Sequence, residues 1–428
     1  MKILLEAPIM TRSGYGEHSR LVYRSLKTIP NANIEIMPLN WGNTSWVSED
    51  SVNKEELDEI QKSIEKHNDS VNIAKSSNTQ INYDIHIHVG IPNEFQKKAN
   101  YSVCVTAGIE TDRVDASWLI KTYQGIDKII VPSEHSKEVF MKTSYEALNE
   151  SNNTKTTIEC NCPVDVVPYP TKTFDDSETL DFTLPTKFNF LSVALLGPRK
   201  NLEKMVKLFI DEFSENSEVG LILKTGRVSG SLMDRNFTVA HFNRIVNNYK
   251  PDKKCKIYIL HGDLSDKEIH SLYTSDDIHA YITATHGEGY GLPIFEAAYS
   301  GMPIVATDWS GHLDFLSAEY KESGKIKTKK LFARVDYNLE AIPHEAVWKN
   351  IVPEGSKWAN PNGVSFRKQL KNIYKNFGMY KKWAAALKKS LEQTHNNDKI
   401  LKTMATAILD RSSPMQTTPE NNEEVLVL

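Results

Sequence analysis

Apolar and polar positions follow the same alternation in both halves of the chain. Short apolar runs predict strands, and the stretches between them carry helical spacing, as in SEHSKEVFMKT and NLEKMVKLFIDEF. The predicted strands are KILLEAP, INYDIHIHVG, YSVCVTAGIE and DKIIVPS in the first half, and FNFLSVALL, VGLILKT, KIYILHG, IHAYITAT and PIVAT in the second. Because such alternation is typical of parallel sheets covered on both faces, we expect an α/β protein with two Rossmann-like doubly wound domains.

A polar stretch near the middle of the chain, TKTFDDSETLDFTLPTK, predicts a domain boundary. A chain of 428 residues also exceeds what one hydrophobic core usually organises. Residues 147–159 read as a surface loop. The predicted segments are an N-terminal domain at 1–178, a C-terminal domain at 186–380, helices at 381–411 that pack back toward the N-terminal domain, and a disordered tail at 412–428.

Composition narrows the class of protein. Hydrophobic residues make up 40% of the chain and charged residues 25%, as in a globular protein. The four cysteines are too few and too unevenly spaced for a disulfide framework, which favours a reducing compartment. The N-terminus lacks the features of a signal peptide, and no apolar run is long enough to span a membrane. We therefore expect a cytoplasmic protein without a transmembrane segment, of unknown oligomeric state.

The net charge of -4 is unevenly distributed. Residues 1–180 hold 18 Lys and Arg against 26 Asp and Glu, so the remainder of the chain is basic. An acidic surface binds nucleic acid or anionic lipid poorly, because both reward Lys and Arg. The charge of the first half therefore weighs against nucleic-acid or membrane-bound partners.

The segment richest in candidate chemistry is ITATHGEGYGLPIFEAAYSGMPIVAT, where a predicted strand runs into a glycine-dense loop and then a helix. Gly287, Gly289 and Gly291 allow a ligand to approach the backbone, and N–H groups at a helix N-terminus favour phosphate. Glu288 and Glu296 stand eight apart, and carboxylates accept hydrogen bonds from sugar hydroxyls. By spacing alone, two such glutamates and a glycine turn are common.

The surrounding letters resemble the retaining GT-B glycosyltransferases of the large family that includes sucrose synthase and bacterial mannosyltransferases. The family signature is E-x7-E around a G-[FY]-G-[LN]-P core, and this chain has it complete as EGYGLPIFE. The resemblance implies two domains that face each other across a cleft, with a nucleotide-sugar donor bound by the second. It places the donor at Glu288, Glu296, Gly289, Tyr290, Gly291 and Leu292.

A second part of the resemblance is the string PRKN, which follows the first predicted strand of the C-terminal half. In the family a Lys of this turn binds the donor phosphates, so Lys200 is the first candidate and Arg199 the second. Two cations and a helix dipole can stabilise a departing diphosphate without a metal. No DxD string is present, and we expect no metal and no cofactor apart from the donor. The alternative is a solvated basic turn.

Two further segments of the C-terminal half resemble family segments less specifically. HGDLSDKEIH resembles the stretch whose backbone receives the nucleotide base, which places Gly262, Asp263 and Leu264 near the base. TDWSGHLDFL resembles the segment that closes on the donor, with Gly311 and His312 as lining candidates. Neither segment identifies the base or the sugar.

In the N-terminal half, SGYGEHSR resembles the family's glycine loop, with Gly14, Tyr15 and Gly16 at the acceptor side of the cleft. YSVCVTAGIETDRVDASW carries an E-x-D-R string where other members place a His. Glu110 and Asp112 are the candidates for orienting the acceptor, and the alternative is that they cap the next helix.

Histidines and cysteines give weaker signals. His86 and His88 share one face of a predicted strand, but without a third ligand they are more typical of the core than of a metal site. Cys160 and Cys162 lack a second pair, which disfavours zinc.

The family resemblance implies transfer of a hexose or pentose with retention of configuration. Glu288, Lys200 and Arg199 are then the catalytic candidates, with the leaving diphosphate accepting the proton of the acceptor. The expected acceptor is a glycan or small molecule. One alternative is a hydroxymethylated base in DNA, and another is a nucleotide-sugar-binding protein without turnover.

Overall fold

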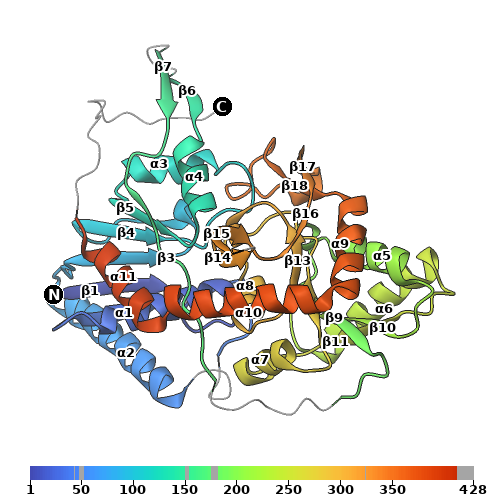
Figure 1. Ribbon diagram of the computed structural model, residues 1–428. Helices are drawn as coiled ribbons and strands as arrows, with labels where there is room; N and C mark the ends of the chain where they lie inside the picture. Colours follow the sequence, from blue (N-terminus) through green and yellow to red (C-terminus); the bar gives the residue numbers. More distant parts are fainter. Residues whose placement is uncertain (43, 48–52, 150–153, 175–181, 323, 412–428) are drawn as a thin grey trace. The chain divides into compact units, whose positions relative to one another are not determined.

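The protein is described here by a computed structural model that covers residues 1–428 except 43, 48–52, 150–153, 175–181, 323 and 412–428. The chain divides into two compact units (Figure 1). Unit 1 consists of Met1–Pro170, Ile342–Ser356 and the segment that begins at Asn397, and unit 2 consists of Thr171–Ala341 and Lys357–Asn396. The chain therefore passes between the units more often than one boundary implies.

Unit 1 is built on a six-stranded parallel sheet with the order β2-β1-β3-β4-β5-β8. Its strands are β1 (Lys2–Ala7), β2 (Asn33–Pro38), β3 (Ile85–Val89), β4 (Tyr101–Val105), β5 (Lys128–Val131) and β8 (Val164–Val166). The central strands β3 and β5 are buried along their whole length, as strands of a parallel sheet covered on both faces should be.

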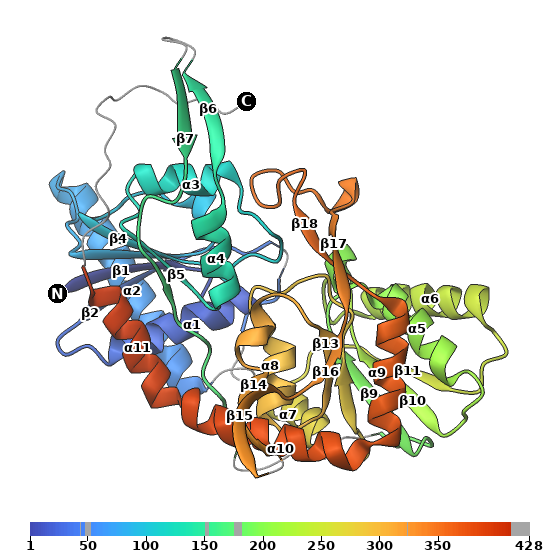
Figure 2. The ribbon, with the colours of Figure 1, turned by 45° about the horizontal axis from the view of Figure 1, so that its top comes forward.

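The helices of unit 1 cover both faces of this sheet. They are α1 (Gly14–Lys27), α2 (Lys54–Ser77), α3 (Ala116–Tyr123), α4 (Glu134–Lys142) and α11 (Asn397–Leu409), with a 3-10 turn η1 (Pro92–Glu94). Figures 1 and 2 show α3 and α4 on one face and α1 and α11 on the other. Trp118 and Phe140 fill the core beneath α3 and α4. The indole N–H of Trp118 also donates to the backbone oxygen of Asn350, 2.8 Å away, which ties the segment 342–356 to this unit.

Unit 2 repeats the architecture with a second six-stranded parallel sheet, of order β11-β10-β9-β12-β13-β16. Its strands are β9 (Phe188–Val193), β10 (Val219–Lys224), β11 (Lys256–Leu260), β12 (Ala280–Ile282), β13 (Ile304–Thr307) and β16 (Ala333–Val335). Two antiparallel pairs accompany it, β14 (Ser317–Glu322) with β15 (Lys325–Lys330), and β17 (Tyr337–Ala341) with β18 (Lys357–Pro361).

Unit 2 has an apolar core between its sheet and part of its helices. The helices of this unit are α5 (Leu202–Phe213), α6 (Leu232–Tyr249), α7 (Asp266–Thr274), α8 (Leu292–Tyr299), α9 (Gly363–Lys375) and α10 (Phe377–Thr394), with 3-10 turns η2 (Pro198–Lys200) and η3 (Gly311–Asp314). A further 3-10 turn, η4 (His344–Ala346), belongs to unit 1. Phe190 of the sheet, Phe209 of α5 and Phe366 of α9 are fully buried in this core. Burial of side chains of this size contributes on the order of 2 kcal/mol each, which makes the sheet a rigid base for the loops at its edge.

These observations confirm the predicted fold class, two Rossmann-like α/β units with parallel sheets. The prediction of a loop at 147–159 is wrong, because β6 (Tyr145–Asn149) pairs antiparallel with β7 (Thr154–Ile158). Figure 2 shows this pair projecting from the rest of unit 1. Its polar sequence suggested a loop, but a two-stranded ribbon with most of β7 exposed needs few apolar residues. The predicted disordered tail lies outside the described residues.

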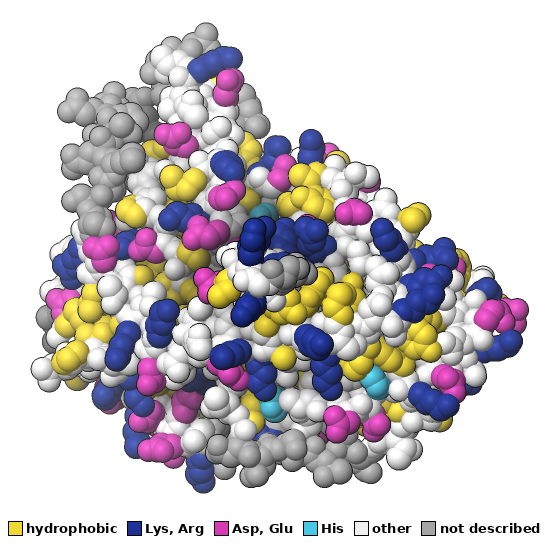
Figure 3. All heavy atoms as spheres, in the orientation of Figure 1, with side chains coloured by type: hydrophobic (Ala, Val, Ile, Leu, Met, Phe, Trp, Pro, Cys, Tyr) yellow, Lys and Arg dark blue, Asp and Glu magenta, His cyan; other side chains and the backbone are white. Residues whose placement is uncertain are grey.

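Charge is unevenly spread over the surface of unit 2. Dark blue side chains gather over α10 and over the β14 and β15 pair in Figure 3. The exposed lysines of these elements are Lys321, Lys325, Lys327, Lys381, Lys382 and Lys389. The basic character that the sequence assigns to the second half is therefore visible on this surface.

Candidate functional site: two turns at the carboxyl edge of the second sheet

The basic turn of unit 2 follows β9. It forms the 3-10 turn η2, which carries Arg199 and Lys200, and Asn201 then starts α5 with a positive φ of 52°. Asparagine adopts this left-handed conformation more readily than most residues. Its side-chain amide also donates to the backbone oxygen of Ala284, 3.1 Å away. Asn201 therefore shapes the basic turn and joins it to the loop after β12.

The glycine-dense loop runs from the end of β12 to the start of α8. Gly291 has a φ of 95°, a conformation that favours glycine, and caps α8. The backbone of Glu288 is fixed from both sides: its N–H donates to Ser310 Oγ at 2.9 Å, and its oxygen accepts from the N–H of Gly311 at 2.9 Å. The segment after β13 thus holds the loop in place. In that segment His312 is buried, and its Nε2 is hydrogen-bonded to the backbone oxygen of Thr307.

The two turns meet at the Glu288 carboxylate. Lys200 Nζ lies 2.6 and 2.8 Å from its two oxygens, and Arg199 Nη1 lies 2.9 Å from Oε2. Arg199 also donates to the backbone oxygen of Gly287 at 2.7 Å, and the Thr285 hydroxyl donates to Glu288 Oε1 at 2.9 Å. Residues that are almost ninety positions apart in the sequence therefore form one charged cluster.

The electrostatics of this cluster explain how a buried carboxylate is tolerated. Only 6% of Glu288 is exposed. Burial alone raises the pKa of Glu288, but Arg199, Lys200 and the Thr285 hydroxyl lower it, and the resulting pKa is about 2. With Glu288 ionised, one negative charge faces two positive charges. Two cations thus stand beside one buried carboxylate, an arrangement that suits an anionic ligand.

Glu296 lies on α8, on the helix that leaves the glycine-dense loop. The hydroxyl of Tyr273, from α7, donates to Glu296 Oε2 at 3.2 Å. Burial and the nearby Glu296 carboxylate raise the pKa of Tyr273, so the hydroxyl keeps its proton for this bond. The side chain of Tyr290 is buried and packs against Phe295 and Phe315.

Gly262, Asp263 and Leu264 follow β11 at the same carboxyl edge of the sheet. Gly262 has a φ of 113°, and its backbone oxygen accepts a bond from Lys224 Nζ at 2.6 Å. β10 lies between β9 and β11, so these residues are separated from the basic turn by the loop after β10. The sequence-predicted residues of unit 2 therefore share one edge of one sheet.

In unit 1, Gly14, Tyr15 and Gly16 form the first turn of α1, capped by Ser13. A Cβ at Gly16 would lie 2.0 Å from the backbone oxygen of Thr11, so only glycine fits there. The hydroxyl of Tyr15 lies 2.8 Å from Thr106 Oγ1, which brings the glycine turn close to the loop after β4.

Glu110 and Asp112 lie in the loop between β4 and α3 and are partly buried. The alternative that they cap α3 is wrong, because the side chain of Asp115 accepts from the N–H of Ser117 at the start of that helix. Asp112 instead lies 3.7 Å from the guanidinium of Arg113. Their role in binding an acceptor stays a prediction.

His86 and His88 belong to the core of unit 1. His86 Nε2 and His88 Nδ1 lie 2.9 and 3.2 Å from Glu6 Oε2, and Lys98 Nζ lies 2.7 Å from Glu6 Oε1. Burial raises the pKa of Glu6, but the two histidines and Lys98 together lower it by more than burial raises it, so the net shift is downward. Among the described residues no group of three or more His, Cys, Asp or Glu could hold a metal, and all four cysteines are free.

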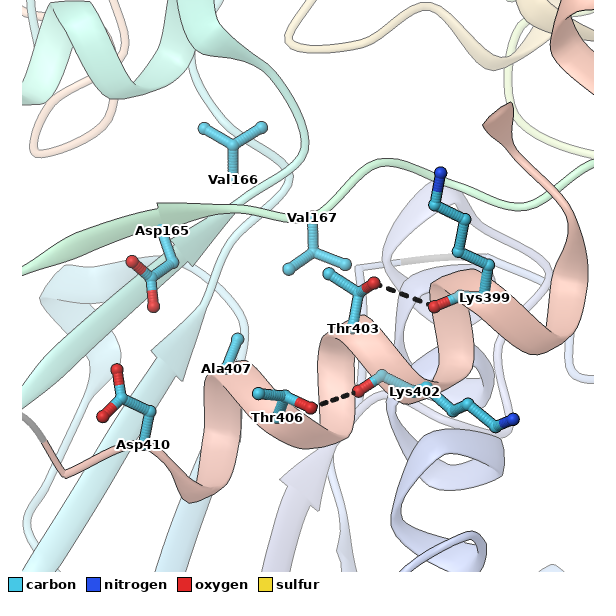
Figure 4. A pocket seen from close by; sticks show the side chains of 9 residues that line it. All are labelled: Asp165, Val166, Val167, Lys399, Lys402, Thr403, Thr406, Ala407 and Asp410. Carbon is cyan, nitrogen blue, oxygen red and sulfur yellow. Dashed lines mark hydrogen bonds between the residues drawn. The ribbon is translucent and has the colours of Figure 1, made fainter. Parts of the chain in front are cut away.

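A groove between β8 and α11 of unit 1 is unrelated to these turns (Figure 4). The hydroxyls of Thr403 and Thr406 donate to the helix oxygens of Lys399 and Lys402. The carboxylates of Asp165 and Asp410, which also line the groove, lie 2.9 and 3.3 Å from Lys128 Nζ. These polar groups are thus paired within unit 1, and the groove offers no chemistry comparable to that around Glu288.

Acid unfolding tests the Glu288 cluster. The folded-state pKa of Glu288 is about 2 against an ordinary value of 4.5, so its stabilising effect is present in full above pH 4.5 and is lost as the pH falls toward 2. The two values correspond to about 3 kcal/mol. We expect Glu288→Gln to lower the free energy of unfolding by about this amount at pH 7 and by little at pH 2.5, measured by denaturant titration. The surface variant Glu203→Gln should show no such trend, and a difference for Glu288→Gln that is independent of pH would contradict the assignment.

Comparison with known proteins gives a family match for part of the chain. Residues 181–329, which include both turns, match the family described as "Glycosyl transferases group 1". The match covers about a third of the chain, and solved structures share the fold over nearly its whole length. Within the described residues, no helix is long and apolar enough to cross a membrane.

Among individual proteins, the chain is similar to the serotype-specific mannosyltransferase WbdA of Escherichia coli, at 26% identity over 136 residues. This match spans 31% of the chain and only 15% of the relative. A sucrose-phosphate synthase from Thermosynechococcus elongatus has the same fold, with a TM-score of 0.60, 11% identity and coverage of 95% of this chain and 98% of that one.

Two further solved structures share the fold. One is "Trehalose-6-phosphate from E. coli bound with UDP-2-fluoro glucose", with a TM-score of 0.57, 11% identity and coverage of 97% and 100%. The other is Anabaena Alr3699/HepE in complex with UDP-glucose, with a TM-score of 0.54, 12% identity and coverage of 95% and 99%. At these identities the likeness establishes the fold alone.

The structure also identifies residues at the site that the sequence analysis did not single out. Thr285 and Ser310 bind Glu288 directly, and Asn201 joins the two turns. Asn201 was recognisable, since it ends the PRKN string, but its role depends on a contact 83 positions away. The contacts of Thr285 and Ser310 leave no pattern in the sequence.

Proposed function

We propose that this protein transfers a sugar from a nucleoside diphosphate sugar to a glycan or small-molecule acceptor, with retention of configuration. The observation that carries the proposal is the convergence of Arg199 and Lys200 on Glu288 beside a glycine-dense loop. Two cations held side by side attract a diphosphate. Because related folds have been solved with UDP-sugars, UDP-sugars are the first donors to test.

In the proposed reaction, Lys200 and Arg199 bind the diphosphate and stabilise the negative charge that develops on it as the bond to the sugar breaks. Gly289, Gly291 and Leu292 lie in the loop that enters α8, whose N-terminus favours the same phosphates. Glu288 and Glu296 accept hydrogen bonds from hydroxyls of the sugar and the ribose. Gly262, Asp263 and Leu264 contact the base through their backbone.

Retention follows from the state of Glu288 in this proposal. A double displacement needs a carboxylate that is available as a nucleophile. Both oxygens of Glu288 accept bonds from Lys200, and Thr285 and Arg199 bind them as well, which lowers their nucleophilicity. We therefore propose attack on the face from which the diphosphate departs, with a diphosphate oxygen accepting the proton of the acceptor hydroxyl. Neither a metal nor a further cofactor takes part in this scheme.

A thermal-shift panel of UDP-, GDP-, ADP- and TDP-sugars tests the proposal. A ligand that binds only the folded state stabilises it by about 2.7 kcal/mol at a hundred times its dissociation constant, which raises Tm by several degrees. We expect one base to give this shift, and slow release of nucleoside diphosphate from the same sugar nucleotide. No shift with any donor would refute the proposal, whereas a shift without release would favour a binding protein without turnover.

A hydroxymethylated base in DNA is the alternative acceptor. The specific observation in its favour is the lysine-rich surface formed by α10 and β15, because phosphate backbones attract such surfaces (Figure 3). The acidic first half of the chain favours an uncharged acceptor. A gel shift with modified duplex DNA at low and high salt separates the two, since a complex that forms at low salt and transfers sugar to the DNA would support the alternative.

A further inference from the structure

Asp234, in the first turn of α6, is the centre of a second dense set of hydrogen bonds in unit 2. Its Oδ1 accepts from the N–H of Arg227 at 2.9 Å, and its Oδ2 accepts from the N–H groups of Val228 and Ser229 at 2.6 and 2.8 Å. The Thr238 hydroxyl lies 3.1 Å from Oδ1. One carboxylate therefore fixes three consecutive backbone groups of the loop after β10.

The same carboxylate reaches the segment after β11. His261 Nε2 lies 3.3 Å from Asp234 Oδ1, and His261 directly precedes Gly262. The two segments are also in close contact, because a Cβ at Gly230 would lie 3.2 Å from Asp263 Oδ2 and 3.3 Å from the backbone nitrogen of Asp263. Glycine at position 230 permits this approach. Asp234 thus joins the loop after β10 to the segment proposed to receive the base.

The position of the loop gives this connection a consequence for the donor. In the sheet, β10 lies between β11 and β9, so the loop after β10 separates the segment 261–264 from the basic turn. The N–H of Leu196, just before that turn, donates to the backbone oxygen of Gly226 at 2.9 Å. The loop 225–231 is therefore bonded on one side to the strand end that leads to the phosphate-binding candidates and on the other to the base-binding candidates.

We propose that Asp234 is a positioning residue that sets the distance between the base and phosphate subsites of the donor site, and thereby contributes to the choice of nucleotide base. The inference rests on the proposed function. Asp234 itself touches only protein groups. It acts through the backbone of residues 227–229 and through His261, whose placement determines where the backbone of Gly262 and Asp263 meets the base.

A carboxylate is required because all of its described partners can donate. The side chain of Asp234 is 7% exposed, so an unsatisfied polar group there would be costly. Burial raises the pKa of Asp234, but the N–H groups of residues 227–229 and His261 lower it by more than burial raises it. The net shift is downward, so the group is ionised at neutral pH. An asparagine would turn an amide N–H toward at least one of the backbone donors and break the arrangement.

The test compares Asp234→Asn with the matched variant Asp211→Asn, which alters a partly buried aspartate of α5 that accepts a bond from Tyr249. We expect Asp234→Asn to raise the donor KM about 10-fold while kcat stays within about 2-fold, because hydrogen bonds to a charged group are lost away from the reacting atoms. The decisive readout is the ratio of the dissociation constants for UDP and GDP. We expect this ratio to move toward one by about 10-fold in Asp234→Asn and to stay constant in Asp211→Asn.

A merely structural role for Asp234 would lower Tm and leave the ratio of the two dissociation constants unchanged, and that result would overturn the inference. If Asp234→Asn does not fold, His261→Asn removes only the connection to the segment after β11, and the same shift of the ratio is expected. Failure of the proposed function is distinguishable, because the unmodified protein would then bind none of UDP, GDP, ADP and TDP.

Discussion

Lys200→Ala is expected to lower kcat/KM by about 10²- to 10³-fold and to abolish the thermal shift produced by the donor. The loss has this size because Lys200 is proposed to stabilise charge that develops on the leaving diphosphate in a site where water is largely excluded. Its Nζ lies within 2.8 Å of both Glu288 oxygens, so it is held at the point where the two turns meet. Steady-state kinetics and thermal shift on the same preparation measure both effects.

The fold should survive this substitution. Glu288 keeps Arg199 and Thr285 as partners, so we expect the free energy of unfolding to fall by only about 1–3 kcal/mol. The matched control is Lys207→Ala, which removes a lysine of α5 that pairs with Glu203 on the surface. Lys207→Ala should leave kcat/KM within about 2-fold. A Lys200→Ala protein that binds and turns over the donor normally would remove Lys200 from the site.

Glu296→Ala is expected to weaken donor binding by about 10²-fold or more. Its carboxylate is proposed to accept two hydrogen bonds from vicinal hydroxyls, and bonds to a charged acceptor are the stronger kind. Binding of the nucleoside diphosphate alone, measured by calorimetry beside that of the full donor, shows which part of the ligand Glu296 holds. Loss of affinity for both ligands would assign the ribose to Glu296, and loss for the full donor alone would assign the sugar.

Stability and binding can be separated at this position through Tyr273. Its buried hydroxyl donates to Glu296 Oε2, so Glu296→Ala leaves that donor without this partner at a cost of about 1–3 kcal/mol. We expect the double variant Tyr273→Phe with Glu296→Ala to recover part of this stability and none of the donor affinity. Recovery of affinity in the double variant would mean that Glu296 acts only on the fold.

The sequence predicted the parallel sheets well because buried strands between helices leave a strong local pattern. β5 and β10 are apolar along nearly their whole length, and Ser265 with Glu268 forms the capping box that begins α7. The β6 and β7 pair was missed for the opposite reason. Its strands are largely polar, so they carry no alternation of apolar residues.

For the site, the two turns were recognisable because glycines and adjacent cations are constrained by backbone conformation and charge. Gly291 needs a positive φ, and the PRKN turn needs a residue such as Asn201 that tolerates one. The sequence could not supply the partners of Glu288, since Thr285 and Ser310 are common residues in ordinary positions. It also gave no indication of Asp234, whose five partners come from three separate segments.

The sequence by itself determined the class of fold and singled out the two turns, because local spacing dictates strands, helix starts and the placement of charge. Only the tertiary structure decided that Arg199 and Lys200 share one buried carboxylate and that Asp234 joins two loops of the same sheet edge. The physical reason is that hydrogen bonds and ion pairs depend on distances between atoms. In a parallel sheet, the order of the strands sets these distances between residues that are far apart in the chain.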